Sequence, residues 1–271
     1  MTVDIRNLTL ANPAPVLVRD YVPRTPSELP PMLWVHGGGF AGGSTDMPES
    51  DAVARRLAGM GQVVRTVEYR LAPPIPDAGP LAPDESESRY PAARDDVVRA
   101  FFDLVPDGSA FLGGASAGAC IAASAAIRLR DEQRPQPLGL VLVYGLFHAR
   151  FPLHKDAEGE QLRTLTDASA DEWLTRMNTN YVGAVDGLAD PRAFPGEGDP
   201  AGLPATLILD AQRDSLRASG KRFAQQLIHA GVPTTEIVVS DAEHGFLNDP
   251  GSRHFMRGTA EMHHWMRSYP L

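Results

Sequence analysis

Cysteine is almost absent from this chain, and so are the apolar segments that mark a membrane or secreted protein. The 271 residues contain a single cysteine, Cys120, so no disulfide can form within the chain. A reducing compartment such as the cytoplasm is therefore the expected location. No apolar stretch reaches the roughly 18 residues of a membrane-spanning helix. No charged segment followed by an apolar run opens the sequence. We expect a soluble protein with no membrane partner.

Basic charge is also scarce. The chain carries 25 Lys and Arg against 34 Asp and Glu, which gives a formal net charge of −9. This negative balance argues against nucleic acid or an anionic membrane as a partner. The lysine and spacing of a phosphate-binding P-loop are missing, as is a dinucleotide-binding fingerprint. The histidines near the C-terminus could form a metal site, but no carboxylate or cysteine lies at a ligand-like spacing from them, so we expect no metal.

What the chain does contain is an alternation of apolar runs and amphipathic stretches. With 43% hydrophobic residues it can bury a sizeable core. Continuous apolar strands that alternate with helices predict a mostly parallel sheet covered by helices on both faces. Residues 3–21 predict one or two antiparallel edge strands. The other expected strands are 32–36, 62–69, 109–115, 139–146, 205–211 and 235–240, and the expected helices are 48–59, 91–104, 117–130, 217–230 and 252–267.

Two segments interrupt this alternation. Residues 72–90 hold five prolines and the acidic run Asp84-Glu85-Ser86-Glu87, which predicts a mobile surface loop. The acidic run would either solvate that loop or repel anionic substrates, and charge runs more often do the former. Residues 147–203 are long and polar, with a helical stretch near 171–181. We expect them to form a reduced cap over a catalytic core made of residues 1–146 and 204–271.

The most informative stretch is Gly114-Ala115-Ser116-Ala117-Gly118, which lies between an expected strand and an expected helix. This pattern in this context is the nucleophile elbow of an α/β-hydrolase. Its turn is so tight that the serine adopts strained backbone angles and the flanking glycines let the two backbones approach. The alternative is an ordinary Gly/Ala-rich helix start, which the strand-to-helix context makes the weaker interpretation.

A serine nucleophile needs a histidine base and an orienting carboxylate, which follow the serine in this fold in the order acid, then base. His244 follows the last expected strand in a loop, whereas His229, His254, His263 and His264 fall on helices. For the acid, Asp214 lies in a loop and Asp210 lies within a strand. Position favours Asp214, although an aspartate there could equally cap the following helix.

An oxyanion hole should come from a loop after an early strand. The run His36-Gly37-Gly38-Gly39-Phe40 meets that requirement, because three glycines leave backbone amides unobstructed. We expect the amides of Gly37 and Gly38, together with that of Ala117, to bind the oxyanion. The phenylalanines Phe40, Phe147 and Phe246 are candidate pocket walls, with Phe151 and Phe194 as further candidates, although each fits core or cap packing equally well.

Five motifs in order resemble the hormone-sensitive-lipase-like family of carboxylesterases. The resemblance covers roughly residues 30–265 and implies an α/β-hydrolase fold that hydrolyses short acyl esters without a cofactor. It also implies that Asp214 is the triad acid, and it suggests a homodimer. The motifs are His36-Gly37-Gly38-Gly39-Phe40, Tyr69-Arg70-Leu71-Ala72-Pro73, the elbow, Asp214-Ser215-Leu216-Arg217 and His244-Gly245-Phe246.

Three departures from the family pattern bear on substrate range rather than on chemistry. Ala115 stands where the family commonly has an acidic residue, Ser215 replaces a proline, and Pro74 replaces a glutamate. The expected reaction is acyl transfer to Ser116, with His244 as base and Asp214 orienting it. Amide cleavage or deacetylation would use the same triad. A non-catalytic small-molecule receptor is a further alternative, which the intact His244 motif disfavours.

Overall fold

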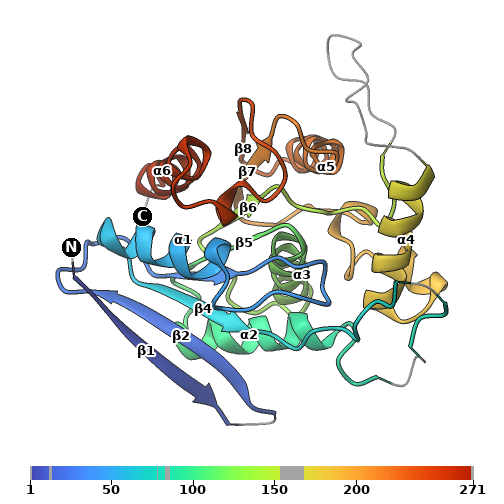
Figure 1. Cartoon of the computed structure of the whole chain (residues 1–271). Helices are drawn as coiled ribbons and strands as arrows, with labels where there is room; N and C mark the ends of the chain where they lie inside the picture. Colours follow the sequence, from blue (N-terminus) through green and yellow to red (C-terminus); the bar gives the residue numbers. More distant parts are fainter. Residues whose placement is uncertain (1, 12–13, 78, 83–85, 153–167, 270–271) are drawn as a thin grey trace.

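The protein is built around one eight-stranded sheet. The computed structural model describes residues 2–11, 14–77, 79–82, 86–152 and 168–269. The strand order is β1-β2-β4-β3-β5-β6-β7-β8, and all neighbours from β4 to β8 pair in parallel, whereas β1 and β2 pair antiparallel (Figure 1). The strands are β1 (Val3–Leu10), β2 (Val16–Pro23), β3 (Met32–Val35), β4 (Val64–Glu68), β5 (Phe111–Ala115), β6 (Gly139–Val143), β7 (Ala205–Ala211) and β8 (Thr234–Val239).

Helices cover both faces of this sheet. One face is covered by α1 and α6, and the other by α2, α3 and α5 (Figure 1). Because both faces are covered, the central strands β3, β5 and β6 are buried along their whole length, which is why their sequences are continuously apolar. The helices are α1 (Pro48–Gly59), α2 (Ala92–Leu104), α3 (Ala117–Asp131), α4 (Ala168–Val182), α5 (Arg217–His229) and α6 (Arg253–Arg267), with short 3-10 turns η1 (Val185–Ala189), η2 (Pro195–Glu197) and η3 (Phe246–Asn248).

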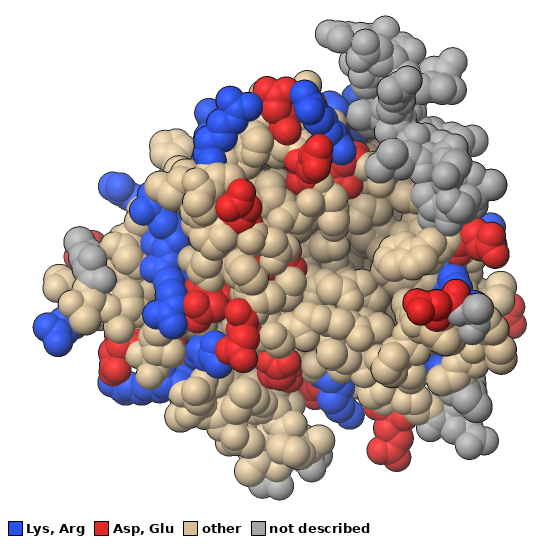
Figure 2. Space-filling model, in the orientation of Figure 1, with Lys and Arg blue, Asp and Glu red and all other residues tan. Residues whose placement is uncertain are grey.

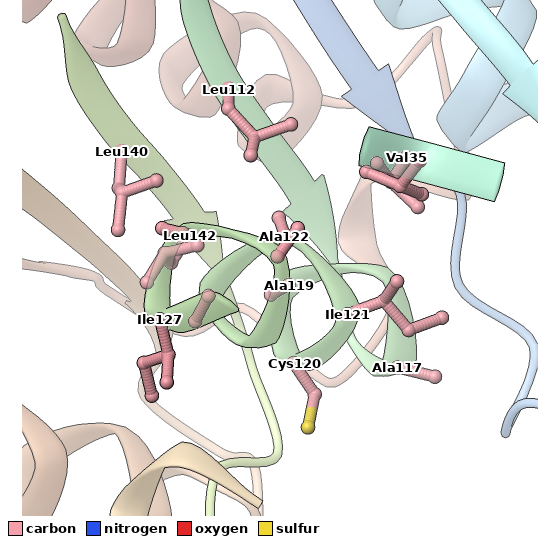
Figure 3. Packing of buried hydrophobic residues seen from close by; sticks show 14 of the residues in the cluster. Val35, Leu112, Ala117, Ala119, Cys120, Ile121, Ala122, Ile127, Leu140 and Leu142 are labelled. Carbon is pink, nitrogen blue, oxygen red and sulfur yellow. The ribbon is translucent and has the colours of Figure 1, made fainter. Parts of the chain in front are cut away.

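Helix α3 lies at the centre of the larger core. Its alanines let the helix lie close to the strands, as Figure 3 shows for Ala119 and Ala122 beside Leu112 and Leu142. The side chain of Cys120 points away from the sheet, and its thiol donates to the carbonyl of Ala193 at 3.4 Å. Burial raises the pKa of this thiol far above its ordinary value.

The expected α/β-hydrolase architecture is confirmed, and most element boundaries differ from the expected ones by only a few residues. Residues 3–21 hold two antiparallel strands rather than one. The helix expected near 171–181 is α4, which starts at Ala168 and lies on the side of the sheet where the parallel strands end (Figure 1). Among the described helices, none combines the length and apolarity that crossing a membrane requires.

The described part of the proline-rich segment, residues 72–90, is a surface loop, as its composition predicts, and hydrogen bonds attach it to α4. Asn180 on α4 donates to the carbonyl of Pro73 at 2.7 Å, and Arg176 donates to the carbonyls of Pro76 and Gly79 at 3.1 and 2.7 Å. Arg89 in turn donates to the carbonyl of Asn180. The described part of the segment is therefore bound along α4. Asp84 and Glu85 of the acidic run lie outside the described residues.

Candidate active site

Ser116 occupies a turn that only glycine neighbours permit. Its backbone angles are φ 53° and ψ −120°, a left-handed conformation that is strained for a residue with a side chain. A Cβ atom on Gly114 would lie 2.5 Å from the carbonyl carbon of Gly118, and one on Gly118 would lie 2.3 Å from the carbonyl oxygen of Val35. Strand β5 and helix α3 therefore meet closely enough to hold the serine hydroxyl at the sheet edge.

A chain of hydrogen bonds joins Ser116, His244 and Asp214. The hydroxyl of Ser116 lies 3.0 Å from Nε2 of His244, and Nδ1 of His244 donates to Oδ2 of Asp214 at 2.7 Å. The other carboxylate oxygen of Asp214 accepts the amide of Leu216 at 2.8 Å, just before α5 begins. The helix cap that the sequence also offered for Asp214 does not form, because α5 begins at Arg217 without a side-chain cap and this bond closes a turn before the helix.

The environment of His244 suits a base that becomes charged. Partial enclosure by itself lowers the pKa of His244, but the hydrogen bond and negative charge of Asp214, with a further contribution from the charge of Glu49, outweigh it. The net result is a pKa above the ordinary value for histidine. The carboxylate side chain of Asp214 is only 1% exposed, so its charge acts with little screening by solvent.

Asp210 does not take part in this chain of bonds. Its side chain is buried within β7, and neither oxygen has a hydrogen-bond partner among the described residues. Burial, with the charges of Asp214 and Glu236, raises the pKa of Asp210 well above its ordinary value, which favours the neutral form. Of the helical histidines, His229 bonds to the carbonyl of Gln225 in its own helix.

The glycine loop after β3 differs from the expectation at one residue. The amide of Gly37 donates to the carboxylate of Glu49 at 2.6 Å, so it is not free to bind an oxyanion. Gly38 and Gly39 have φ values of 113° and 60°, which glycine adopts without strain. Within the described residues, the amides of Gly38, Gly39 and Ala117 donate to no acceptor, and all three residues line the pocket.

The bond to Glu49 therefore argues against the expected place of Gly37 in an oxyanion hole. Gly39, which was not among the expected donors, has an amide that is free in the described part of the chain instead. Its only signal was membership of the same glycine run. The distinction between the three amides depends on Glu49, which lies on the following helix.

A buried pair of aromatic rings packs beside this loop and bonds to its backbone. The ring of His36 stacks on that of Tyr69 with centroids 4.3 Å apart, and the hydroxyl of Tyr69 donates to the carbonyl of His36 at 3.0 Å. Nδ1 of His36 lies 2.8 Å from the carbonyl of Gly37, which requires the tautomer with hydrogen on Nδ1. Burial lowers the pKa of His36 and so favours this neutral form.

The serine lies at the bottom of a pocket of about 790 Å³ between the His244 loop and α4. Figure 2 shows a hollow on this face whose visible walls are mostly uncharged. The wall opposite the catalytic residues comes largely from α4, where Trp173 is 56% exposed. Within the described chain, no lysine or arginine lines this pocket, whose apolar lining residues are Met47, Ala117, Leu146, Phe151, Trp173, Leu174, Met177 and Leu216.

The phenylalanines chosen from the sequence are not pocket walls, with one exception. Phe40 is stacked on Tyr181 with centroids 3.9 Å apart, and Phe147 is stacked on Phe223 at 4.6 Å. Phe246 packs edge-on against Tyr144. All three are buried in the core, as is Phe194, and only Phe151 lines the pocket. These rings are buried because they pack against other aromatic side chains. A single sequence does not show which aromatic residues will pack together.

Metal ligands do not gather in the described part of the chain, where no group of three or more His, Cys, Asp and Glu side chains lies close enough to hold an ion. The groups in contact at the site are a hydroxyl, an imidazole, a carboxylate and free backbone amides. Together they can carry out nucleophilic attack on a carbonyl carbon and stabilise the resulting oxyanion.

Comparison with known proteins identifies relatives for almost the whole chain. A family model described as the alpha/beta hydrolase fold matches residues 32–248. Esterase LipI of Mycobacterium tuberculosis is 33% identical over 256 residues, which cover 90% of this chain and 75% of LipI. Carboxylesterase NlhH of the same organism is 31% identical and is matched over 86% of this chain and 69% of its own length. This chain thus spans between two thirds and three quarters of these relatives.

Solved structures give the same result. A hyperthermophilic esterase from the archaeon Pyrobaculum calidifontis superimposes with a TM-score of 0.80 at 27% sequence identity, covering 98% of this chain and 85% of that one. The order of strands, the nucleophile elbow and these relatives agree. The chain belongs to the hormone-sensitive-lipase-like family of α/β-hydrolases, and it is a carboxylic ester hydrolase.

Proposed function

We propose that the chain hydrolyses short-chain acyl esters through an acyl-enzyme on Ser116. The observation that carries this proposal is the hydrogen-bonded chain from Ser116 through His244 to Asp214. His244 accepts the serine proton as the hydroxyl attacks the ester carbonyl, and Asp214 holds the imidazole in the required tautomer. His244 then protonates the leaving alcohol, and water repeats the attack on the acyl-enzyme.

The tetrahedral intermediate places a negative charge on the former carbonyl oxygen. The amides of Gly38, Gly39 and Ala117 would bind it, since each is free and each lines the pocket beside Ser116. Donors of this kind typically contribute about 2.7–4 kcal/mol each to transition-state stabilisation. Their backbone positions are set before substrate arrives, so little reorganisation is needed.

The pocket walls favour a neutral ester with an apolar body. Eight apolar residues line the pocket, and among the described lining residues the charged groups besides the triad come from Glu49. An anionic acyl group would meet two carboxylates, Asp214 and Glu49, and no cation from the described part of the chain. We propose that residues 147–203 act as a reduced cap through α4, which leaves acetyl to butyryl as the preferred acyl groups; residues 153–167 lie outside the described residues. A chain-length series of p-nitrophenyl esters with a maximum at C8 or beyond would contradict this preference.

The first test is Ser116→Ala, with Ser109→Ala on the surface as the matched control. Loss of the nucleophile should reduce kcat on p-nitrophenyl acetate by roughly 10⁴-fold or more, while the melting temperature stays close to that of the wild type. Ser109 donates only to Asp107 at an exposed site, so its variant should keep full activity. Turnover by Ser116→Ala would remove Ser116 from the mechanism.

A fluorophosphonate probe separates an enzyme from a non-catalytic receptor, because only an activated serine reacts with it. Matched anilide and ester substrates then separate an amidase from an esterase. A cytoplasmic location and a homodimer also stay predictions, and light scattering of the purified protein tests the second.

A further inference from the structure

Glu49 is a buried carboxylate that the catalytic mechanism does not use. It is the second residue of α1, beneath the glycine loop, and only 2% of its surface is exposed. Carboxylates are rarely buried this deeply without a cation. Among the described residues, no lysine, arginine or histidine forms an ion pair with Glu49. Its charge must therefore be stabilised by other donors.

Those donors come from three separate segments that surround the active site. Oε1 accepts the amide of Gly37 from the glycine loop at 2.6 Å. Oε2 accepts the hydroxyl of Tyr144, just after β6, at 2.8 Å, and the side-chain amide of Asn248 at 3.2 Å. All three partners are donors, so the carboxylate acts only as an acceptor, which is the bonding pattern of its ionised form.

The backbone of Glu49 is held as firmly as its side chain. Its amide donates to the side-chain oxygen of Asn248 at 3.3 Å, which completes a reciprocal pair between the two residues. Its carbonyl accepts the indole N–H of Trp34, on β3, at 2.8 Å. The position at the N-terminal turn of α1 also favours a negative charge there.

Two of these contacts reach the catalytic machinery directly. Because the amide of Gly37 is held by Glu49, the peptide groups that follow it, those of Gly38 and Gly39, are fixed at the pocket wall. On the other side, the ring of Tyr144 packs edge-on against the imidazole of His244, with centroids 5.1 Å apart. Asn248 ends the 3-10 turn that follows His244. Glu49 therefore bonds to both the oxyanion loop and the histidine loop.

We propose that Glu49 is a positioning residue that holds the oxyanion loop and the His244 loop in fixed relation, and that its charge stabilises the imidazolium formed during the reaction. This inference deepens the proposed function and rests on it. Ala115 stands beside the nucleophile, where related sequences commonly carry an acid.

The electrostatic part of the proposal involves few groups. The charges that face His244 are those of Asp214 and Glu49, and both favour its protonated form. Tyr144 is the remaining titratable neighbour. Burial, followed by the charge and hydrogen bond of Glu49, raises the pKa of Tyr144 well above its ordinary value, so its hydroxyl stays protonated at working pH. Removing the charge of Glu49 should therefore lower the pKa of His244.

The test is Glu49→Gln, with Asp51→Asn as a matched control on the same helix. Asp51 also accepts a tyrosine hydroxyl, that of Tyr21, at 2.8 Å, but it lies away from the site. Loss of a complete oxyanion donor typically costs about 10²–10³-fold in kcat. Misplacing the loop in Glu49→Gln should reduce kcat by roughly 10–100-fold with KM nearly unchanged. The acid limb of kcat/KM should move to lower pH, and Asp51→Asn should change neither quantity.

Several outcomes would overturn the proposal. Unchanged kcat together with an unchanged acid limb would show that Glu49 is only structural. A higher KM with normal kcat would make it a substrate contact instead. Rates are expressed per active site titrated with the fluorophosphonate probe, so partial unfolding of Glu49→Gln cannot imitate the effect.

A second variant guards against a complete loss of folding. Asn248→Ala removes one donor to Glu49 at an exposed position but leaves the charge of Glu49 in place, so it should lower kcat by a smaller factor and keep the wild-type acid limb. A wild-type kcat in this variant would overturn the positioning role of Glu49. If the wild-type protein fails to hydrolyse esters or to react with the probe, the proposed function is refuted. If the wild-type protein is active and Glu49→Gln has the same kinetics, only the role of Glu49 is refuted.

Discussion

The two walls of the pocket are held in place by different means. The catalytic wall depends on backbone constraint: Ser116 is strained between two glycines, and Gly38 and Gly39 adopt left-handed angles. The wall formed by α4 is held in place by hydrogen bonds from the side chains of Arg176 and Asn180 to carbonyls of the proline-rich segment. Atoms that react need positions set to within a fraction of an ångström. Atoms that only enclose a substrate do not.

This difference predicts separate consequences for mutations in each wall. Changes in the catalytic wall should alter kcat for every ester. Changes in α4 should alter KM and the preference among acyl chains, and they should leave the chemistry of the smallest ester intact.

The largest effect should come from Asp214→Asn. The amide would favour the wrong tautomer of His244, and kcat should fall by about 10⁴-fold for all chain lengths. The matched control is Asp210→Asn, four residues earlier. Burial favours the neutral form of this carboxyl, which has no hydrogen-bond partner among the described residues, so the variant should keep near-normal kcat. Comparable losses in the two variants would mean that burial, rather than the bond to His244, accounts for the effect.

The pH profile provides the next test. His244 must be neutral to accept a proton, and its pKa is raised above the ordinary 6.5. Activity should therefore fall by about tenfold per unit as the pH drops below a midpoint that lies above 6.5. The same shift favours protonation in the folded state, so the stability it contributes is complete at low pH and is lost as pH rises through the folded pKa. Variants of α4 should share the wild-type midpoint of kcat/KM, since α4 places no charge at the imidazole.

The smallest effect should come from Trp173→Ala in the α4 wall. The indole is about half exposed at the pocket, and its loss should raise KM for p-nitrophenyl butyrate by roughly fivefold to tenfold. Turnover of the acetate should stay within about twofold of the wild type. If kcat for the acetate falls as well, α4 also helps to position the catalytic wall. The contact that would transmit this effect is that of Met177, on the same helix, with Gly39.

The same contrast explains what the sequence could and could not predict. The elbow, the His244 loop and most element boundaries follow from local patterns, because glycine spacing and apolar periodicity leave direct traces in a sequence. The choice among three adjacent glycine amides depended on Glu49, on the following helix, and no local pattern contains it. The aromatic residues were misassigned because stacking partners such as Phe147 and Phe223 lie far apart in the chain.

The attachment of the proline-rich segment to α4 could not be predicted for a related reason. Its composition is typical of a surface loop, but the carbonyls of Pro73, Pro76 and Gly79 accept hydrogen bonds from α4 across about 100 residues of chain. Backbone acceptors carry no sequence signal, since every residue has one.

The position of the single thiol has a practical consequence. Because Cys120 is buried in α3 with a raised pKa, reagents that alkylate thiolates should leave the native protein unlabelled. A cysteine introduced at an exposed site would then be the only reactive one, with no need to build a cysteine-free background. Placed on α4, a fluorescent label could follow that helix during turnover while the catalytic wall stays unmodified.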